Sequence, residues 1–271
     1  MIDIFYYPFM RYALFGAILS GFGSALLSNF IVLKKMEFIS DGAAHIAFGA
    51  IALALFLGIN MNLLSIIVAL VFAISIHYMS KQEKIQESSI IGMLLSLSMA
   101  TGIILLSFVK GYVPEVESFL FGDILMITLE DLILLSISDI FILFFIILFN
   151  KELKYYAYNQ KLSKIFGVPT NIINLIFLSI TSVTIVLSVK IVGIILITSL
   201  LITPGVIAKL FSKSINQMIL ISVIVGVSAS VFGIISSYYL NIPSGPMIVV
   251  TLFTVFLISY GIKRLSFGEN D

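Results

Sequence analysis

The stretch KKMEFISDGAAHIAFGAIALALFLG, residues 34–58, decides the fold. Two lysines and a short turn precede a long apolar run, in which Asp41 and His45 are the only ionisable side chains. A helix that crosses the hydrocarbon core of a membrane needs about 20 mainly apolar residues. The stretch therefore predicts a membrane-spanning helix that begins next to positive charge and carries two polar groups.

The composition of the whole chain is that of a membrane protein. Of its 271 residues, 60% are hydrophobic and 11% are charged, whereas a soluble domain has about 45–50% apolar and about 25% charged residues. A water-soluble fold is excluded, and membrane lipid is the expected surrounding. The 15 basic and 14 acidic residues nearly cancel, which leaves no basic field for nucleic acid. Because the chain has no cysteine, any metal ligand must be His, Asp or Glu.

Eight further apolar runs lie along the chain, each bounded by charged or turn residues. Their uniform length favours helices over the strands of a barrel, because a helix satisfies its own backbone hydrogen bonds in lipid. The sequence predicts an all-α polytopic membrane helix bundle, a single transmembrane domain over residues 1–271. A half-span at 122–128 would change the count to eight or ten. The nine expected spans are 9–33, 38–58, 62–79, 88–109, 132–149, 170–189, 191–210, 216–240 and 246–262.

Positive residues in the connections indicate the orientation, because they are retained on the cytoplasmic side. With the N-terminus outside and the C-terminus inside, only Arg11, Lys110 and Lys190 face outward. The other twelve basic residues then face the cytoplasm: Lys34, Lys35, Lys81, Lys84, Lys151, Lys154, Lys161, Lys164, Lys209, Lys213, Lys263 and Arg264.

Asp41 and His45 are the first candidates for a functional site. A spacing of four places both side chains on one helix face, about one turn apart. Ionisable groups inside a membrane are costly and point to function, and a carboxylate with a neutral imidazole suits Mn, Fe or Zn. The alternative is structural, with Asp41 capping the helix and His45 hydrogen-bonded in the core.

Phe48 lies one turn outward of His45, beside the small residues Gly49 and Ala52. A bare divalent ion cannot pass an apolar constriction without ligands that replace its water. We therefore expect Phe48 to act as a gate, which opens when the helices separate.

Two other ionisable residues lie in or beside apolar runs. Asp139 is near the middle of the fifth run. It serves as a proton relay or cation ligand, or it is a structural carboxyl that is kept protonated or is bonded to a neighbouring hydroxyl. His77 ends the third run next to Tyr78 and a charged connection, where we expect it to be solvated.

The stretch FNKELKYYAYNQKLSKIFGVPT, near residues 149–170, is the longest connection on the expected cytoplasmic side. It predicts a short amphipathic helix that ends at Gly167, serving either as a surface anchor or as a docking segment for a soluble partner. On the other side, Glu115, Glu117 and Asp123 form an acidic segment, which attracts cations, receives a basic patch on a delivery protein, or is only solvated.

Several catalytic motifs are missing from the sequence. No GxxxxGK[ST] motif occurs, so the chain cannot hold a nucleotide in a phosphate loop. HExxH and GxSxG are also absent. An intramembrane aspartyl protease built on Asp41 and Asp139 stays possible, although its usual GxGD signature is missing, since Gly122 and Asp123 follow Leu120 and Phe121.

Several segments resemble the permease subunits of bacterial ATP-binding-cassette importers for manganese, zinc or iron, of the ABC-3 family and type II architecture, which work with cluster A-I metal-binding proteins. A basic pair precedes the Asp-x-x-x-His helix start, as in that family. Ala44 departs from the pattern, where the family commonly has Ser, and Asp139 is not a family feature. The other similar segments are 87–107, 117–125, 189–214 and 237–250.

The resemblance implies roles for particular residues. Asp41 and His45 match the metal-coordinating pair, and two copies in a homodimer would supply an Asp2His2 set. The outer acidic segment and the turn at 242–246 would receive the metal-loaded binding protein. The stretch near 150–168 matches the segment that couples to a separate ATPase, with these residues as expected contacts: Tyr155, Tyr156, Lys161, Phe166 and Gly167.

The sequence therefore predicts a multi-pass permease in the bacterial inner or plasma membrane. It would import a divalent transition metal, without enzymatic activity or a cofactor of its own, while a separate subunit hydrolyses ATP. The alternatives are a proton-coupled secondary metal transporter, for which Asp139 is suited, and an intramembrane aspartyl protease. Asp and His serve Mn, Fe and Zn alike, so the sequence does not select the metal.

Overall fold

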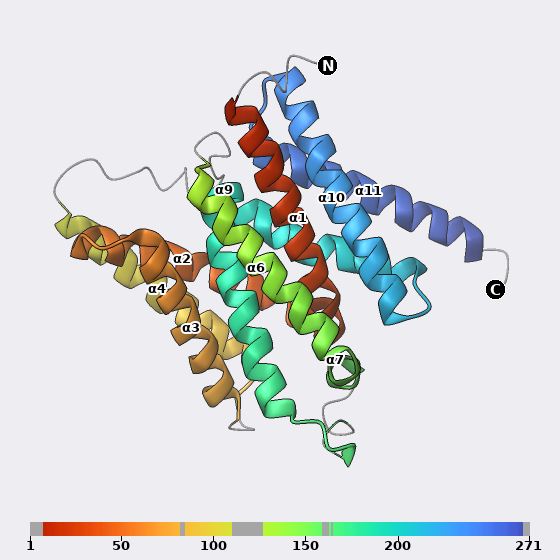
Figure 1. Cartoon of the computed structure of the whole chain (residues 1–271), viewed down its shortest axis with the longest axis horizontal. Coiled ribbons are helices and arrows are strands. Elements are labelled where there is room, and N and C mark those ends of the chain that lie inside the picture. The colour runs from red at the N-terminus through yellow and green to blue at the C-terminus, as the bar shows by residue number, and fades with distance from the viewer. Residues whose placement is uncertain (1–7, 82–84, 110–126, 159–162, 164, 268–271) are drawn as a thin grey trace.

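The computed structural model describes residues 8–81, 85–109, 127–158, 163 and 165–267. Within these ranges it contains nine helical segments long and apolar enough to cross a membrane, which confirms the expected all-α bundle. The helices, shown in Figure 1, are α1 (Pro8–Lys34), α2 (Phe38–Leu57), α3 (Met61–Ser80), α4 (Glu87–Phe108), α6 (Leu129–Leu148), α7 (Asn150–Tyr158), α9 (Thr170–Phe211), α10 (Ile215–Leu240) and α11 (Ser244–Phe267).

Helix α9 contains two of the nine spans. Its 42 residues are too many for one crossing, since about 20 suffice, and the chain departs from helical geometry at Gly193, where φ is 80° and ψ is 166°. That backbone conformation favours glycine, which has no Cβ to clash. The two spans are Thr170–Val189 and Val192–Phe211.

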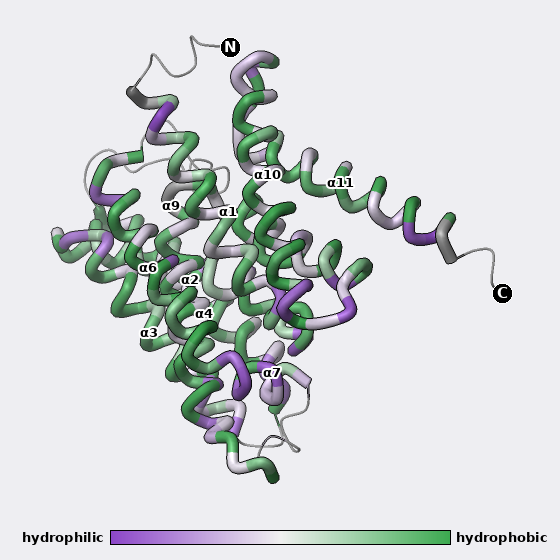
Figure 2. Tube along the Cα trace, turned by 45° about the vertical axis from the view of Figure 1, so that its right-hand side comes forward, coloured by the Kyte–Doolittle hydropathy of each residue, from purple (hydrophilic) through white to green (hydrophobic). Residues whose placement is uncertain are grey.

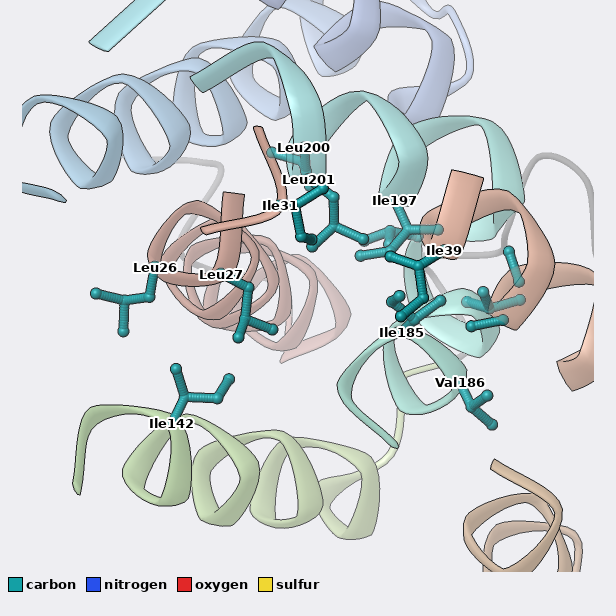
Figure 3. Packing of buried hydrophobic residues seen from close by; sticks show 14 of the residues in the cluster. Leu26, Leu27, Ile31, Ile39, Ile142, Ile185, Val186, Ile197, Leu200 and Leu201 are labelled. Atoms are coloured by element: carbon teal, nitrogen blue, oxygen red, sulfur yellow. The ribbon is translucent and has the colours of Figure 1, made fainter. Parts of the chain in front are cut away.

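The core of the bundle forms where α1 meets both halves of α9. Figure 3 shows Leu26 and Leu27 of α1 facing Ile142 of α6, and Ile31 of α1 beside Leu200 and Leu201 of α9. All of these side chains are buried. Apolar residues also cover much of the outer surface, and hydrophilic segments gather at helix ends and around α7 (Figure 2). This distribution is expected of a bundle surrounded by lipid.

Small residues bring α1, α9 and α10 into close contact. A methyl group at Gly21 would overlap Ser230 and the backbone of Gly226 in α10. The Ser28 hydroxyl accepts a hydrogen bond from the backbone N–H of Gly205 at 2.7 Å, next to Pro204, which has no N–H to donate. Interfaces lined by small residues let helices associate in lipid, where a hydrophobic driving force between helices is lacking.

The connection between α6 and α9 packs against the bundle through α7. Helix α7 begins at Asn150, directly after the end of α6, and it buries Leu153. Helix α7 ends at Tyr158, before the expected end at Gly167. Gly167 has a φ of 73°, and α9 begins after Pro169. The acidic residues 115–123, most of the suggested half-span 122–128, and Lys161 lie outside the described residues.

Candidate functional site

The back of α2 is packed tightly against α3 and α4. A methyl group at Gly42 would overlap Ile91 of α4 and crowd Phe72 of α3, and one at Gly49 would overlap Ser98 of α4. The Ser98 hydroxyl donates to the backbone oxygen of His45 at 3.4 Å. These contacts fix the rotation of α2 and therefore decide which of its side chains stay uncovered.

The candidate pair lies on the uncovered face of α2. Asp41 is exposed and His45 is partly exposed, while the intervening residues 42–44 are buried. Phe38, one turn before Asp41, is 62% exposed. Because α2 is a membrane span, this face presents a carboxylate and an imidazole at a surface that the single chain does not cover.

The orientation of the His45 ring prepares one nitrogen for a ligand. Its Nδ1 lies 2.8 Å from the backbone oxygen of Asp41, and since a carbonyl oxygen only accepts, Nδ1 carries the hydrogen. The lone pair is therefore on Nε2, the arrangement in which a histidine is oriented by one nitrogen and binds metal through the other. Asp41 does not cap α2, because the helix begins at Phe38 and its N-cap residue is Glu37, which makes no side-chain cap.

Phe48 lies inside the contact between α2 and α4. It is buried, and a methyl group at Gly102 of α4 would overlap its ring. Its ring therefore holds the two helices together just outward of His45. The expected gate at Phe48 would open only if α4 moved relative to α2, and the role stays a prediction.

Asp139 is buried in α6 against α1. Only 4% of the residue is exposed, and neither carboxyl oxygen has a hydrogen-bond partner among the described residues. A methyl group at Gly23 of α1 would overlap its Oδ1. The neighbouring Ser138 is bonded instead to Thr184 of α9, with 2.8 Å between the hydroxyl oxygens. The structure therefore places Asp139 in an interface between helices, and its role as a polar site stays open.

Gly23→Ala should destabilise the protein by about 1–3 kcal/mol, because the new methyl group would be forced against the Asp139 carboxyl. In an Asp139→Ala background the cost of the same change should largely disappear, since contacting residues do not behave additively. Thermal unfolding of the purified chain in detergent measures both.

Gly92→Ala is the matched control, because a methyl group there meets nothing within 4 Å, and alanine favours a helix by up to about 1 kcal/mol over glycine. An equal cost of Gly23→Ala with and without Asp139 would show that the clash lies elsewhere.

The paired carboxylates of an aspartyl protease are not formed. Asp41 is exposed on α2, whereas Asp139 is buried and shares no hydrogen bond with any group in the described part of the chain. A dyad needs the two carboxyls close enough to share one proton. Among the described residues no group of three or more His, Asp or Glu is placed to hold a metal ion. Asp41 and His45 stay the predicted ligand pair.

The expected coupling stretch divides into an exposed part and a buried part. Tyr155 and Phe166 stack with ring centroids 5.3 Å apart, and they are 46% and 65% exposed. Tyr156, in contrast, is 1% exposed. Tyr155 and Phe166, which we call the aromatic pair, offer their stacked rings to a partner, whereas Tyr156 attaches α7 to the bundle.

Tyr156 begins a hydrogen-bond chain that sequence reasoning did not find. Its hydroxyl donates to Oδ1 of Asn174 in α9, whose Nδ2 lies 3.3 Å from Nδ1 of His77 in α3. His77 is 4% exposed, so the expectation that it is solvated was wrong: the first turns of α9 cover it. An asparagine inside an apolar helix was the available signal for this chain.

The surroundings of Tyr156 include two charged residues. The ammonium of Lys34, at the end of α1, lies 4.0 Å from the centre of the Tyr156 ring, within the range of a cation–π contact. Burial raises the pKa of the Tyr156 hydroxyl well above its usual value, and the negative charge of Glu87 in α4 adds to the effect. Tyr156 therefore stays protonated and keeps its hydrogen to donate.

The similarity of this chain to known proteins extends over all the candidate site residues described above. A model of the ABC 3 transport family matches residues 6–263. The chain is 36% identical over 255 residues to the "Probable metal transport system membrane protein" of Thermotoga maritima, covering 94% of this chain and 90% of that protein. It is 32% identical over 254 residues to the manganese import system permease protein ScaB of Streptococcus gordonii, covering 94% and 91%.

A solved structure is similar over the same length. The structure described as PsaBC from Streptococcus pneumoniae in complex with Fab contains a chain that matches with a TM-score of 0.85 and 31% sequence identity. The match covers 98% of this chain and 96% of that one. The arrangement of spans that positions Asp41, His45 and α7 is therefore shared with an experimentally determined structure.

Proposed function

The chain belongs to the ABC 3 transport family, and from that premise we propose that it is the permease of an ATP-binding-cassette importer for a divalent transition-metal ion. It is a multi-pass protein of the bacterial cell membrane, and its described residues contain nine apolar helical segments long enough to span it. The observation that carries the proposal is the pair Asp41 and His45, which lies on an uncovered face of a membrane span.

The pair supplies part of a coordination shell for the ion in transit. The carboxylate of Asp41 and the Nε2 of His45 are ligands for Mn, Fe or Zn, and the bond from Nδ1 to the Asp41 oxygen holds the ring in place. Two protein ligands leave further positions of the metal for other groups. The ion is thus bound firmly enough to enter a membrane span and weakly enough to leave it.

A second copy of the chain is the proposed source of the remaining ligands. A two-fold axis beside the uncovered face of α2 would bring together two Asp41 and two His45 side chains. The exposed Phe38 on the same face would be covered by this contact. The pair is then exposed in a single chain because the homodimer contact that would bury it needs the second copy.

A separate ATPase subunit supplies the energy, and the aromatic pair is its proposed docking site. The residue next to Tyr155, Tyr156, lies beneath Lys34, which places the aromatic pair on the side that the basic residues assign to the cytoplasm. On the opposite side a metal-loaded binding protein, of the cluster A-I class, would contact the turn at 242–246. That turn is held by a bond from the Ser237 hydroxyl to the backbone oxygen of Ile242.

Metal uptake by the reconstituted complex tests the function. The chain, its ATPase and its binding protein are placed in proteoliposomes, and accumulation of Mn, Fe and Zn is measured by elemental analysis with and without ATP. We expect accumulation only with ATP and with both partners present. Uptake driven by a pH gradient in the absence of the ATPase would instead support a proton-coupled carrier, to which the buried Asp139 would be suited.

Phe48→Ala should raise the leak of metal in the absence of ATP several-fold. Removing the ring opens a space between α2 and α4 beside His45, and truncating a buried Phe costs about 3–5 kcal/mol. Phe145→Ala is the control, because Phe145 is also buried but lies in α6. Leak is measured as loss of metal from loaded proteoliposomes, and a tight Phe48→Ala complex would place the barrier on another helix.

A further inference from the structure

Tyr156 lies where the ends of five helices meet. It is the largest side chain among those that are fully buried in the described part of the protein. Its ring is covered by Lys34 from the end of α1, and its hydroxyl reaches Asn174 in the first turns of α9. Through Asn174 it is connected to His77 at the end of α3, and Glu87 begins α4 nearby.

This position links the docking segment to the start of the helix that carries the candidate metal ligands. Tyr156 is the neighbour in sequence of Tyr155, which belongs to the exposed aromatic pair. Lys34 is followed by the turn 35–37, and α2 begins at Phe38. Within this turn Lys35 has a φ of 57° and the Met36 N–H is bonded to the Ile31 oxygen at 3.0 Å, so the turn is fixed to the end of α1.

The contacts of Tyr156 are directional, and this distinguishes them from ordinary core packing. The hydroxyl donates to the oxygen of Asn174, which leaves the Asn174 amide nitrogen to donate to His77. All three residues are buried. Chains of buried hydrogen bonds admit few arrangements, because a group that loses its partner there is costly. A displacement of α7 must therefore move its partners with it.

From this geometry we propose that Tyr156 is a positioning residue that transmits movement of α7 to α2, and so to Asp41 and His45. Its hydroxyl acts through Asn174 in α9 and His77 in α3, and its ring acts through Lys34 and the turn 35–37. The inference rests on the proposed function, since it needs an ATPase that moves α7. The aromatic pair receives the partner, whereas the Tyr156 hydroxyl carries the displacement into the bundle through Asn174 and His77. Lys34 connects the ring to the end of α1.

Tyr156→Phe separates this role from packing. Phenylalanine keeps the ring and the surface beneath Lys34, and it removes only the hydroxyl that Asn174 accepts from. Tyr158→Phe makes the same chemical change on the same helix at a residue that is 88% exposed, and it serves as the control. Both variants are assembled with the ATPase and the binding protein in proteoliposomes, and metal import and ATP hydrolysis are measured together.

We expect Tyr156→Phe to assemble normally and to hydrolyse ATP, but to import about tenfold less metal per ATP, which corresponds to about 1.4 kcal/mol of lost coupling free energy. Tyr158→Phe should keep the ratio of the unaltered complex. A purely structural role for the hydroxyl would lower the unfolding temperature and leave this ratio unchanged. An unchanged ratio in Tyr156→Phe would overturn the inference.

A label on the turn measures the transmission directly. The chain has no cysteine, so Lys35→Cys gives a single thiol for a fluorophore at an exposed position. Addition of ATP to the assembled complex should shift the fluorophore's emission, and the shift should be lost when Lys34→Met removes the ammonium above the Tyr156 ring. A full shift in Lys34→Met would show that movement reaches the turn by another route.

The remaining outcomes also decide between the ideas. If the unaltered complex imports no metal with ATP, the proposed function is wrong; if it imports metal and Tyr156→Phe has the same ratio, only this inference fails. Should Tyr156→Phe not reach the membrane, Asn174→Leu removes the same bond from the other side and is expected to give the same loss. Absence of both variants from the membrane would show that the chain of bonds serves folding, and would overturn the inference.

Discussion

Replacing Asp41 by asparagine, or His45 by alanine, should reduce ATP-driven metal uptake at least about 100-fold, since even groups that only orient metal ligands are worth about 10–100-fold. Asp41→Asn keeps the shape of the side chain and removes its charge. His45→Ala removes the Nε2 lone pair that the bond between Nδ1 and the Asp41 oxygen leaves available. Neither change disturbs the packed back of α2, where Gly42 and Gly49 meet α3 and α4.

The control for this pair is Glu37→Gln, the same chemical change one turn earlier. Glu37 precedes α2 and makes no side-chain cap, so its amide variant should import metal as the unaltered complex does. Uptake of radioactive or elementally analysed metal is measured alongside membrane insertion and complex assembly. Full uptake by Asp41→Asn or His45→Ala in a correctly assembled complex would remove these residues from the transport path.

Loss of the aromatic pair should separate the permease from its ATPase. Tyr155→Ala and Phe166→Ala together remove two exposed rings that stack on each other. Aromatic residues at the centre of an interface typically cost at least about 2 kcal/mol when truncated, or about 30-fold in affinity each. We expect the ATPase to be lost on co-purification, and metal uptake to stop for that reason.

Phe144→Ala is the matched control, because Phe144 is 59% exposed in α6, a membrane span whose outer face meets lipid. It removes an exposed ring without touching the docking segment. Retention of the ATPase by the double variant, measured by co-purification and by titration of the two purified components, would place the docking surface elsewhere. The purified permease alone should show no ATP hydrolysis in either case.

The spans could be predicted from the sequence because each is limited by strong local signals. Apolar runs of sufficient length end at charged residues such as Lys34 or at turn residues such as Gly58, and both helix ends agree with the structure. The spacing of Asp41 and His45 likewise placed them on one face, since it depends only on helix periodicity. Gly167 has a positive φ that glycine accepts, but α7 ends at Tyr158, earlier than the sequence predicted.

The rotation of each helix about its axis could not be predicted in the same way. In a membrane the side that meets lipid and the side that meets protein are both apolar, so hydrophobic periodicity does not distinguish them. Tyr155 and Tyr156 show the difficulty, because one is exposed and its neighbour is fully buried. His77 was misplaced for the same reason: its environment is set by Asn174, far away in the sequence.

The sharp change of direction at Gly193 has a consequence for biosynthesis. The spans Thr170–Val189 and Val192–Phe211 are joined by two residues alone. Lys190 is the single charge between them, which is little to orient either span separately. The insertion machinery must therefore accept them as one hairpin, with Lys154 before it and Lys209 near its end both retained in the cytoplasm. If synthesis stopped between the two spans, the first span would lack the second one, which fixes the side of the membrane on which Val189 lies.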